Sequence, residues 1–173
     1  MSTNELIQRR AAMMQSRSTS IDWETIARGM IDFTTQFSIG ADVAQALEGM
    51  TTLGRRCFYY RTNLIGDVVL PESITNLNNA EVFYYCTSVT SVTIGANCAA
   101  INSSAFQSMG SSMKALIINR ATPPTLNSGT PLSGTPSCII YVPDDAVDTY
   151  KAAQYWDYYA SGRIKGISEL PTT

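Results

Sequence analysis

Two tyrosine pairs carry the clearest candidate binding chemistry in this sequence. Tyr59-Tyr60 and Tyr84-Tyr85 recur in two closely matching segments, and each pair directly follows a phenylalanine. Adjacent residues cannot all face inward, so we expect the phenylalanines to fill the core and the tyrosines to lie outside it. Exposed aromatic rings stack on sugar faces or anchor a protein contact, which makes the four tyrosines candidate ligand-binding residues. The alternative is that each ring packs on its neighbour and stabilises the fold.

The composition argues against catalysis. The sequence contains no histidine, the commonest general base, and its four cysteines show no CxxC spacing. Asp144, Asp145 and Asp148 cluster where a helix N-terminus favours negative charge. No GxSxG, phosphate-loop or dinucleotide-binding motif occurs. We therefore predict no enzyme activity, no cofactor and no metal, and we interpret the cysteines as small buried hydrophobic residues.

Length and charge limit the class of protein further. The 173 residues suffice for one or two domains, and the 45% apolar content permits a core. Charged residues make up only 15%, and the net charge of −2 with a pI near 5.0 argues against nucleic acid as a partner. No window is apolar enough to span a bilayer, and the N-terminus lacks the apolar run of a signal peptide. We expect a chain made in the cytoplasm, with no membrane partner.

A repeat organises the middle of the chain. The segments 68–74 and 92–98 share one pattern of apolar, any, apolar, three turn-forming residues and apolar, and 37–43 carries it before them at a longer interval. The strand part recurs at 116–118, at the same spacing as between the two later segments. A constant period of this size is the signature of a stacked solenoid, which we predict over residues 33–120, with 44–50 as an insertion. The predicted inner columns are Phe37/Val68/Val92/Leu116 and Ile39/Leu70/Ile94/Ile118.

The outward positions of these strands form a second candidate surface. Side chains alternate across a strand, so Val69, Thr93 and Ile117 point away from the predicted core. An uncharged face that becomes apolar is a liability unless something covers it. We therefore predict oligomer contacts at these three residues, with plain exposure to solvent as the alternative.

Both ends of the chain depart from the repeat. Residues 1–17 predict an anchoring helix with a Ser-rich linker, and 18–32 predict the rest of this linker and a helix that caps the first repeat. Residues 121–173 predict a C-terminal cap, because proline-rich loops suit no central strand, although a strand and a helix follow them. The apolar, sulfur-containing stripe of the first helix makes it a candidate virion anchor. Its anchoring residues are Leu6, Ile7, Arg10, Met13 and Met14.

The repeat unit resembles a known family. Residues 70–94, with LPESITNL followed by FYYCTSVTSVTI, are similar to the BspA-type leucine-rich repeat. Residues 122–124, 140–143 and 146–153 resemble the usual terminal segment of that family. Pattern and resemblance together predict a mainly β fold with short helices. It would be a leucine-rich-repeat solenoid with a helical N-terminal segment and an α/β C-terminal cap.

The resemblance also implies a function. The family includes bacterial surface adhesins and, in short forms without a signal peptide, structural proteins of tailed phages, whose start is similar to residues 5–10 and 22–30. We therefore expect a phage virion structural protein, a head or tail fibre or a capsid decoration, on the virion surface. Its expected partners are other virion proteins, further copies in a homo-oligomer, and a host-surface glycan or protein. A bacterial surface adhesin and an intracellular protein-interaction module are the alternatives.

Overall fold

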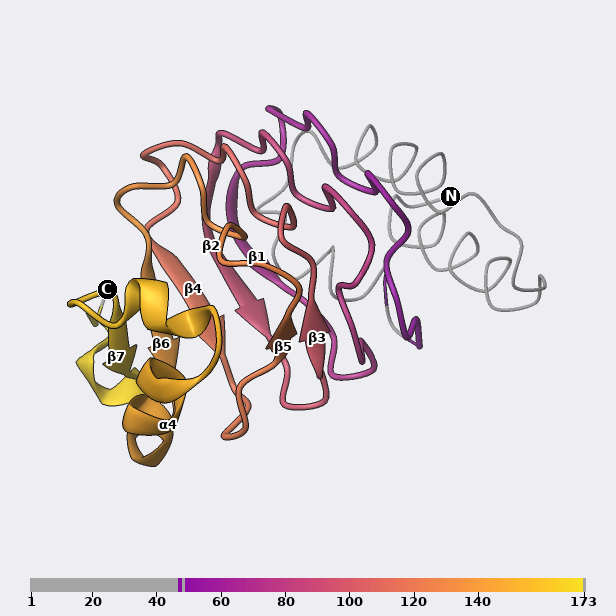
Figure 1. The fold of residues 1–173 in the computed structure, drawn as a ribbon. Helices are drawn as coiled ribbons and strands as arrows, with labels where there is room; N and C mark the ends of the chain where they lie inside the picture. Colours follow the sequence, from indigo (N-terminus) through magenta and orange to yellow (C-terminus); the bar gives the residue numbers. More distant parts are fainter. Residues whose placement is uncertain (1–46, 48, 173) are drawn as a thin grey trace.

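The computed structural model describes Leu47 and residues 49–172 (Figure 1). The helices predicted in 1–17 and 18–32, with the five anchoring residues, lie outside this part of the chain. So do Phe37 and Ile39, the first members of the two predicted inner columns.

Five strands form one parallel sheet in the order β1-β2-β4-β6-β7. Each strand pairs with the next at one constant offset, the repeat period, so that Val68 lies opposite Val92 and Val92 opposite Leu116. Parallel pairing follows from the repeat, because each copy of the strand enters the sheet in the same direction. This confirms the predicted register between described repeats. The strands are β1 (Gly66–Val69), β2 (Val89–Ile94), β4 (Ala115–Ile118), β6 (Ile139–Val142) and β7 (Ile164–Gly166).

A second, shorter line of parallel pairing accompanies the main sheet. Strand β3 (Ala100–Ile101) pairs with β5 (Thr125–Leu126), and Figure 1 shows both in front of β1 and β2. Isolated bridges extend the line from Ile101 to Leu77 and from Asn76 to Thr52. Nearly the same period therefore governs both lines of pairing.

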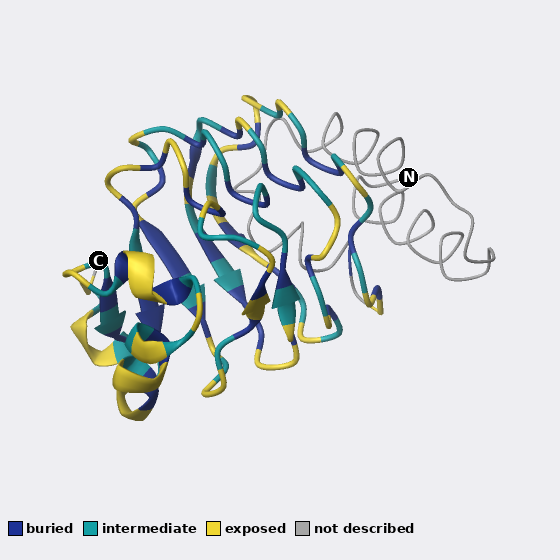
Figure 2. Cartoon of the chain, in the orientation of Figure 1, coloured by how far each residue is buried: buried dark blue, intermediate teal, exposed yellow. Residues whose placement is uncertain are grey.

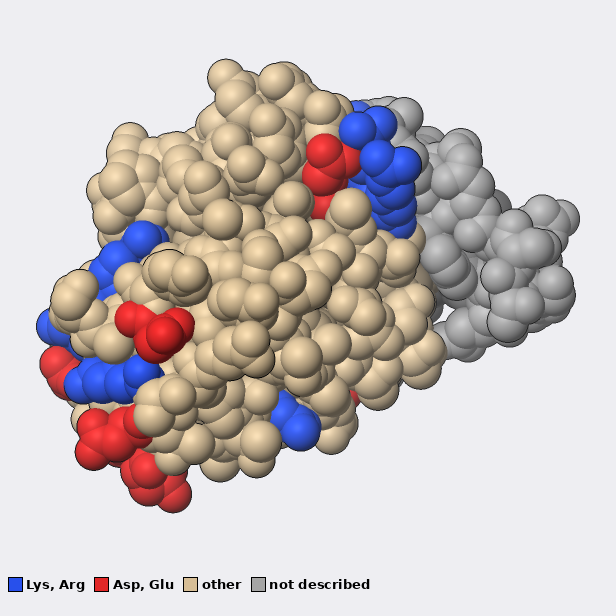
Figure 3. Space-filling view, viewed as in Figure 1, with Lys and Arg blue, Asp and Glu red and all other residues tan. Residues whose placement is uncertain are grey.

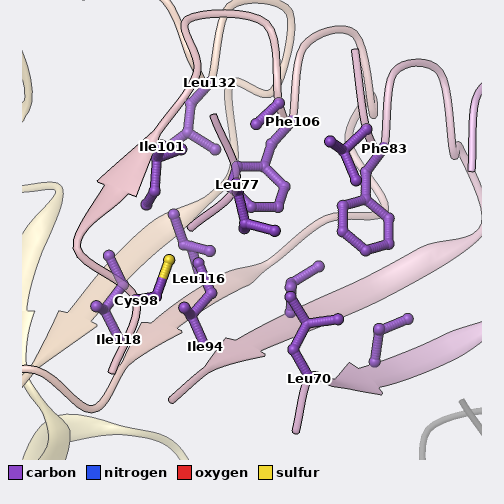
Figure 4. Packing of buried hydrophobic residues seen from close by; sticks show 14 of the residues in the cluster. Leu70, Leu77, Phe83, Ile94, Cys98, Ile101, Phe106, Leu116, Ile118 and Leu132 are labelled. Atoms are coloured by element: carbon purple, nitrogen blue, oxygen red, sulfur yellow. The ribbon is translucent and has the colours of Figure 1, made fainter. Parts of the chain in front are cut away.

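The core lies between three columns of apolar side chains (Figures 2 and 4). The main sheet contributes the two predicted inner columns, and every described member of them is at most 3% exposed. The third column comes from turns, where the Phe83 ring stacks on Phe58 at 4.8 Å and on Phe106 at 5.7 Å. The inner columns and the phenylalanine column are thus confirmed among the described residues. Figure 4 shows side chains from the main sheet, from the second line of pairing and from the turns pointing into one interior. They are Leu70, Ile94 and Ile118, then Leu77 and Ile101, and then Phe83, Phe106 and Leu132.

Of the segment 44–50, predicted to be an insertion loop or a helical turn, the structure describes Leu47, Gly49 and Met50, and these residues follow the repeat. Met50 and Ile74 are both buried at equivalent places of successive repeats, and the N–H of Thr75 donates to the Thr51 carbonyl at 2.8 Å. The prediction was wrong for these three residues, because the sequence before them, Ala-Gln-Ala at 44–46, lacks the large strand-forming residues of later copies. The last apolar position of the repeat pattern was therefore assigned to Val43, whereas Met50 is the residue equivalent to Ile74 in the structure.

The repeat register also continues into the predicted cap. Ile140 of β6 pairs with Leu116 of β4, and Ile164 of β7 pairs with Ile140, at the same offset as the earlier strands. The repeats were expected to end at residue 120, with one more strand in the cap. The main sheet continues through that strand, β6, and on to β7. The prolines that suggested this ending lie in the loops between strands, where a missing N–H costs no sheet hydrogen bond.

Short helical segments cover the last repeats. The single α-helix of the described residues is α4 (Val147–Ala152), and Tyr150 on it packs edge-on against Trp156 with ring centres 5.2 Å apart. Tyr150 donates its hydroxyl proton to the Arg120 carbonyl, and the Trp156 indole donates to the Pro124 carbonyl. These two bonds hold the helical segments on the repeat. The 3₁₀ segments are η1 (Asp144–Ala146), η2 (Trp156–Tyr159) and η3 (Ile167–Glu169).

The register predicts opposite effects for neighbouring residues of β2. Val92 is fully buried and Thr93 lies on the outer face, so Val92→Asp should abolish the cooperative melting transition while Thr93→Asp should melt near the parent. Burying an unpaired carboxylate costs several kcal/mol, in addition to about 1.5–3 kcal/mol of lost apolar burial. Circular dichroism against temperature measures both variants. A parent-like transition for Val92→Asp would contradict the register.

The buried thiols predict a loss of stability in alkali. Cys86 and Cys138 are buried thiols, and burial raises their pKa from 9.0 to about 12. Between these values the unfolded chain releases the thiol protons and the folded chain keeps them. The contribution of these thiols to the free energy of unfolding is therefore complete below pH 9 and is lost toward pH 12. The loss is about 1.4 kcal/mol per pH unit for each thiol.

Chemical denaturation at pH values from 8 to 11 measures this slope. The double variant Cys86→Ala/Cys138→Ala should lose stability less steeply than the parent over that range, whatever its stability at pH 8. Equal slopes for parent and variant would show that these thiols do not contribute.

Candidate functional site

The candidate tyrosines lie on a stack of four turns, which we call the turn face. Backbone hydrogen bonds join successive turns: the N–H of Tyr60 donates to the Tyr84 carbonyl at 2.8 Å, and that of Ser108 to the Ser133 carbonyl at 2.7 Å. Bonds of this kind hold equivalent residues of neighbouring turns beside one another. The turn face consists of residues 55–61, 80–86, 103–109 and 128–135.

The four tyrosines come together as one group, the tyrosine cluster. The rings of Tyr59 and Tyr84 stack with centres 5.2 Å apart, and those of Tyr60 and Tyr85 stack at 4.3 Å. Tyr60 is 51% exposed and Tyr85 38%, whereas the other two rings are half-buried behind them. The rings therefore pack on one another and also present aromatic surface to solvent. Whether they bind a ligand stays a prediction.

Tyr60 and Tyr85 have an unfavourable backbone conformation. Their φ angles are +58° and +60°, a region that costs an ordinary L-residue about 1–2 kcal/mol. In later turns the corresponding places are taken by Ser108 at +59° and Gly134 at +74°. Two large aromatic side chains thus stand in a column that suits glycine or small polar residues better. Strain of this kind at exposed positions favours a functional role for the side chains.

A charged pair borders the tyrosine cluster without charging it. Arg56 donates from Nε to the Glu81 carboxylate, and its guanidinium lies 4.8 Å from the centre of the Tyr59 ring. The bond to Glu81 raises the pKa of Arg56. Partial burial, together with the neighbouring phenols, raises the pKa of Tyr60. At physiological pH the Tyr60 hydroxyl is therefore protonated, and Arg56 is paired with Glu81.

The third and fourth turns of the turn face are uncharged, whereas the first turn also carries Arg55 and Arg61. Between Glu81 and Asp144 the only charged residues are Lys114 and Arg120, and neither belongs to the turns. Figure 3 shows a wide area without charge between the charged groups near the first turns and those at the C-terminal end. Serine, threonine and glutamine supply the polar groups of the third and fourth turns. Such a surface suits a neutral polar ligand better than a charged one.

The predicted oligomer contacts lie side by side on the outer face of the main sheet. Val69 pairs with Thr93, and Thr93 with Ile117. Val69 is 43% exposed, whereas the other two are half-buried. The next member of the column, Tyr141, is already buried by the chain itself. The chain itself thus covers part of this apolar face. The oligomer contact stays a prediction.

Residues 49–172 offer no evident place for a cofactor or metal. Within them, no three Cys, Asp or Glu side chains come close enough together to hold a metal ion. The acidic residues 144, 145 and 148 lie in the first turns of η1 and α4, and Asp144 accepts a hydrogen bond from the N–H of Ser168. Helices in this part of the chain are too short and too polar to cross a membrane.

One exposed aromatic residue was not singled out from the sequence. Tyr158 is 70% exposed, the highest value among the large hydrophobic residues that the structure describes. Its ring stacks on that of Tyr155, with centres 6.4 Å apart. The residue lies in an aromatic run after the repeats and has no counterpart at the repeat period, so periodicity could not reveal it.

Comparison with known families agrees with this geometry. Residues 43–123 match the family model described as BspA type leucine rich repeat region, in six copies. This match supports the BspA-like leucine-rich-repeat family for this part of the chain. The match includes the tyrosine cluster and strands β1 to β4, and such repeats indicate a protein-interaction or adhesin-like module. No curated protein matches the sequence.

Proposed function

We propose that this protein is a structural component of a phage virion that displays its BspA-type repeats as a solenoid to bind host-surface glycans. The observation that carries the binding role is the tyrosine cluster, with two strained and exposed rings stacked at 4.3 Å. The head or tail fibre or capsid decoration role rests on the resemblance of residues 5–10 and 22–30 to the start of phage forms.

A glycan is favoured over a protein partner by the chemistry around the cluster. Tyrosine rings offer a flat face for the C–H side of a sugar and a hydroxyl group for its polar edge. The uncharged serine, threonine and glutamine side chains nearby match the neutral hydroxyl groups of a sugar chain. A protein partner would use the same rings as anchors and is the second ligand class to test.

Display on a particle compensates for weak single contacts. An open surface of stacked rings binds a sugar weakly, because it buries little of the ligand. Many copies on one virion raise the effective concentration of sites and give high avidity without any further contact. The proposed homo-oligomer, with contacts at Val69, Thr93 and Ile117, would group several sites together.

Replacing the exposed rings tests the binding role. In the double variant Tyr60→Asn/Tyr85→Asn, asparagine tolerates a positive φ, so relief of strain should offset the roughly 0.5–1.5 kcal/mol of lost stacking. We expect a melting temperature close to the parent and loss of binding on an array of neutral glycans. The matched variant Tyr60→Phe/Tyr85→Phe keeps the ring faces and should retain most of the binding.

Two results would contradict this role. A large fall in melting temperature with unchanged binding would establish that the tyrosines only stabilise the stack. Binding to a protein array but to no glycan would replace the proposed ligand class with a protein.

Deleting residues 1–17 tests the virion role. The predicted helix, with Leu6, Ile7, Arg10, Met13 and Met14, is separated from the repeats by a Ser-rich linker, so the deletion should leave the melting transition and glycan binding unchanged. Incorporation into phage particles, measured by blotting purified virions, should be lost. Normal incorporation of the shortened chain would refute the anchor.

A further inference from the structure

Tyr158 lies directly on the fourth turn of the turn face. A Cβ added at Gly129 would overlap the Tyr158 ring, so the absence of a side chain at this glycine leaves the space that the ring occupies. The neighbouring Tyr159 hydroxyl donates to the Gly129 carbonyl at 2.9 Å and accepts from the N–H of Leu132 at 3.4 Å. These contacts fix η2, and Tyr158 with it, on the turn.

The surroundings of Tyr158 repeat those of the tyrosine cluster. At both places an exposed tyrosine ring stacks on a nearly parallel ring, with interplanar angles of 7° for Tyr155–Tyr158 and 16° for Tyr60–Tyr85. Positive φ angles occur at both places, at the exposed Tyr60 and Tyr85 in the cluster and, with +69°, at Tyr155 beneath Tyr158. The chain thus builds the same kind of aromatic surface at both ends of the turn face, once inside the repeat and once outside it.

The two aromatic surfaces are separated by a short uncharged stretch. The second and fourth turns are two hydrogen-bonded steps apart, which corresponds to about 10 Å. The third turn, between them, presents the half-buried side chains of Ser104, Gln107 and Ser108. No residue of the third or fourth turn is charged. The spacing of these turns along the stack alone exceeds the width of one sugar ring, so a ligand that touches both surfaces must be a chain of several sugars.

We propose that Tyr158, which packs on Gly129, is a second aromatic subsite for a neutral linear oligosaccharide. One end of the oligosaccharide would lie on the tyrosine cluster, and the other end would contact Tyr158. The inference rests on the proposed function and extends it, because it makes the ligand an extended chain rather than a terminal sugar. The polar side chains of the third turn would contact the sugars between the two subsites.

The dependence of affinity on chain length tests this proposal. Isothermal titration calorimetry of the full chain would use two neutral probes, the disaccharide and the hexasaccharide of N-acetyllactosamine units. We expect the parent to bind the hexasaccharide more tightly. Tyr158→Ser should weaken hexasaccharide binding about two- to tenfold and leave disaccharide binding unchanged. Since Tyr158 is so exposed, its variants should fold as the parent does.

Two further variants separate the ring from its position. Tyr158→Phe keeps the aromatic face and should bind both probes as the parent does. Gly129→Ala keeps the tyrosine but displaces its ring, so it should resemble Tyr158→Ser. Tyr60→Asn/Tyr85→Asn, which removes the proposed near subsite, should weaken the binding of both probes.

The outcomes distinguish the two proposals. The second subsite would be overturned, and the proposed function left intact, by one pair of results. Tyr158→Ser would bind the hexasaccharide with the affinity of the parent, and Tyr60→Asn/Tyr85→Asn would lose the binding of both probes. Equal losses of both probes in Tyr158→Ser would also overturn it, since a separate subsite cannot affect the disaccharide. A parent that binds neither probe would overturn both proposals.

Discussion

Parallel pairing at one constant offset is the constraint on which the rest of this structure depends. Each strand of the main sheet accepts its neighbour at that offset, from β1 to β7, and the second line of pairing and the turns follow it with small deviations. A side chain is thereby placed beside its own equivalents in the adjacent repeats. An apolar position becomes a continuous buried column, and an exposed one becomes a surface row.

The tyrosine cluster is a consequence of this stacking. Phe58 and Phe83 fill the core from the turns, so the tyrosines that follow them must lie outside, and the hydrogen bonds between turns bring their rings together. Stacking alone does not explain why Tyr60 and Tyr85 occupy positive-φ positions, because smaller residues would fit there with less strain. This excess cost at an exposed site is what favours a binding role over packing alone.

The surface beside the cluster has a matching character. The charged residues of the turn face lie in its first two turns, and serine, threonine and glutamine supply the polar groups of the third and fourth turns. The charged residues are Arg55, Arg56, Arg61 and Glu81. A repeat fold gains no enclosed pocket from its architecture, so binding must use an open face and many weak contacts. An uncharged row bounded by aromatic rings is consistent with that way of binding a polar, neutral chain.

The sequence by itself determined the strand register, the buried columns, the phenylalanine stack and the proximity of the four tyrosines, because one repeated pattern of apolar residues permits only one way to bury all copies. Tertiary structure decided what periodicity does not encode. Met50 joins the core although the sequence shortly before it, Ala-Gln-Ala at 44–46, lacks the strand pattern of later copies. Strands β6 and β7 extend the sheet beyond proline-rich loops, because an exposed sheet edge is more stable when paired. Tyr158 reaches the turn face only through the packing of η2 on Gly129, a contact between segments that share no pattern.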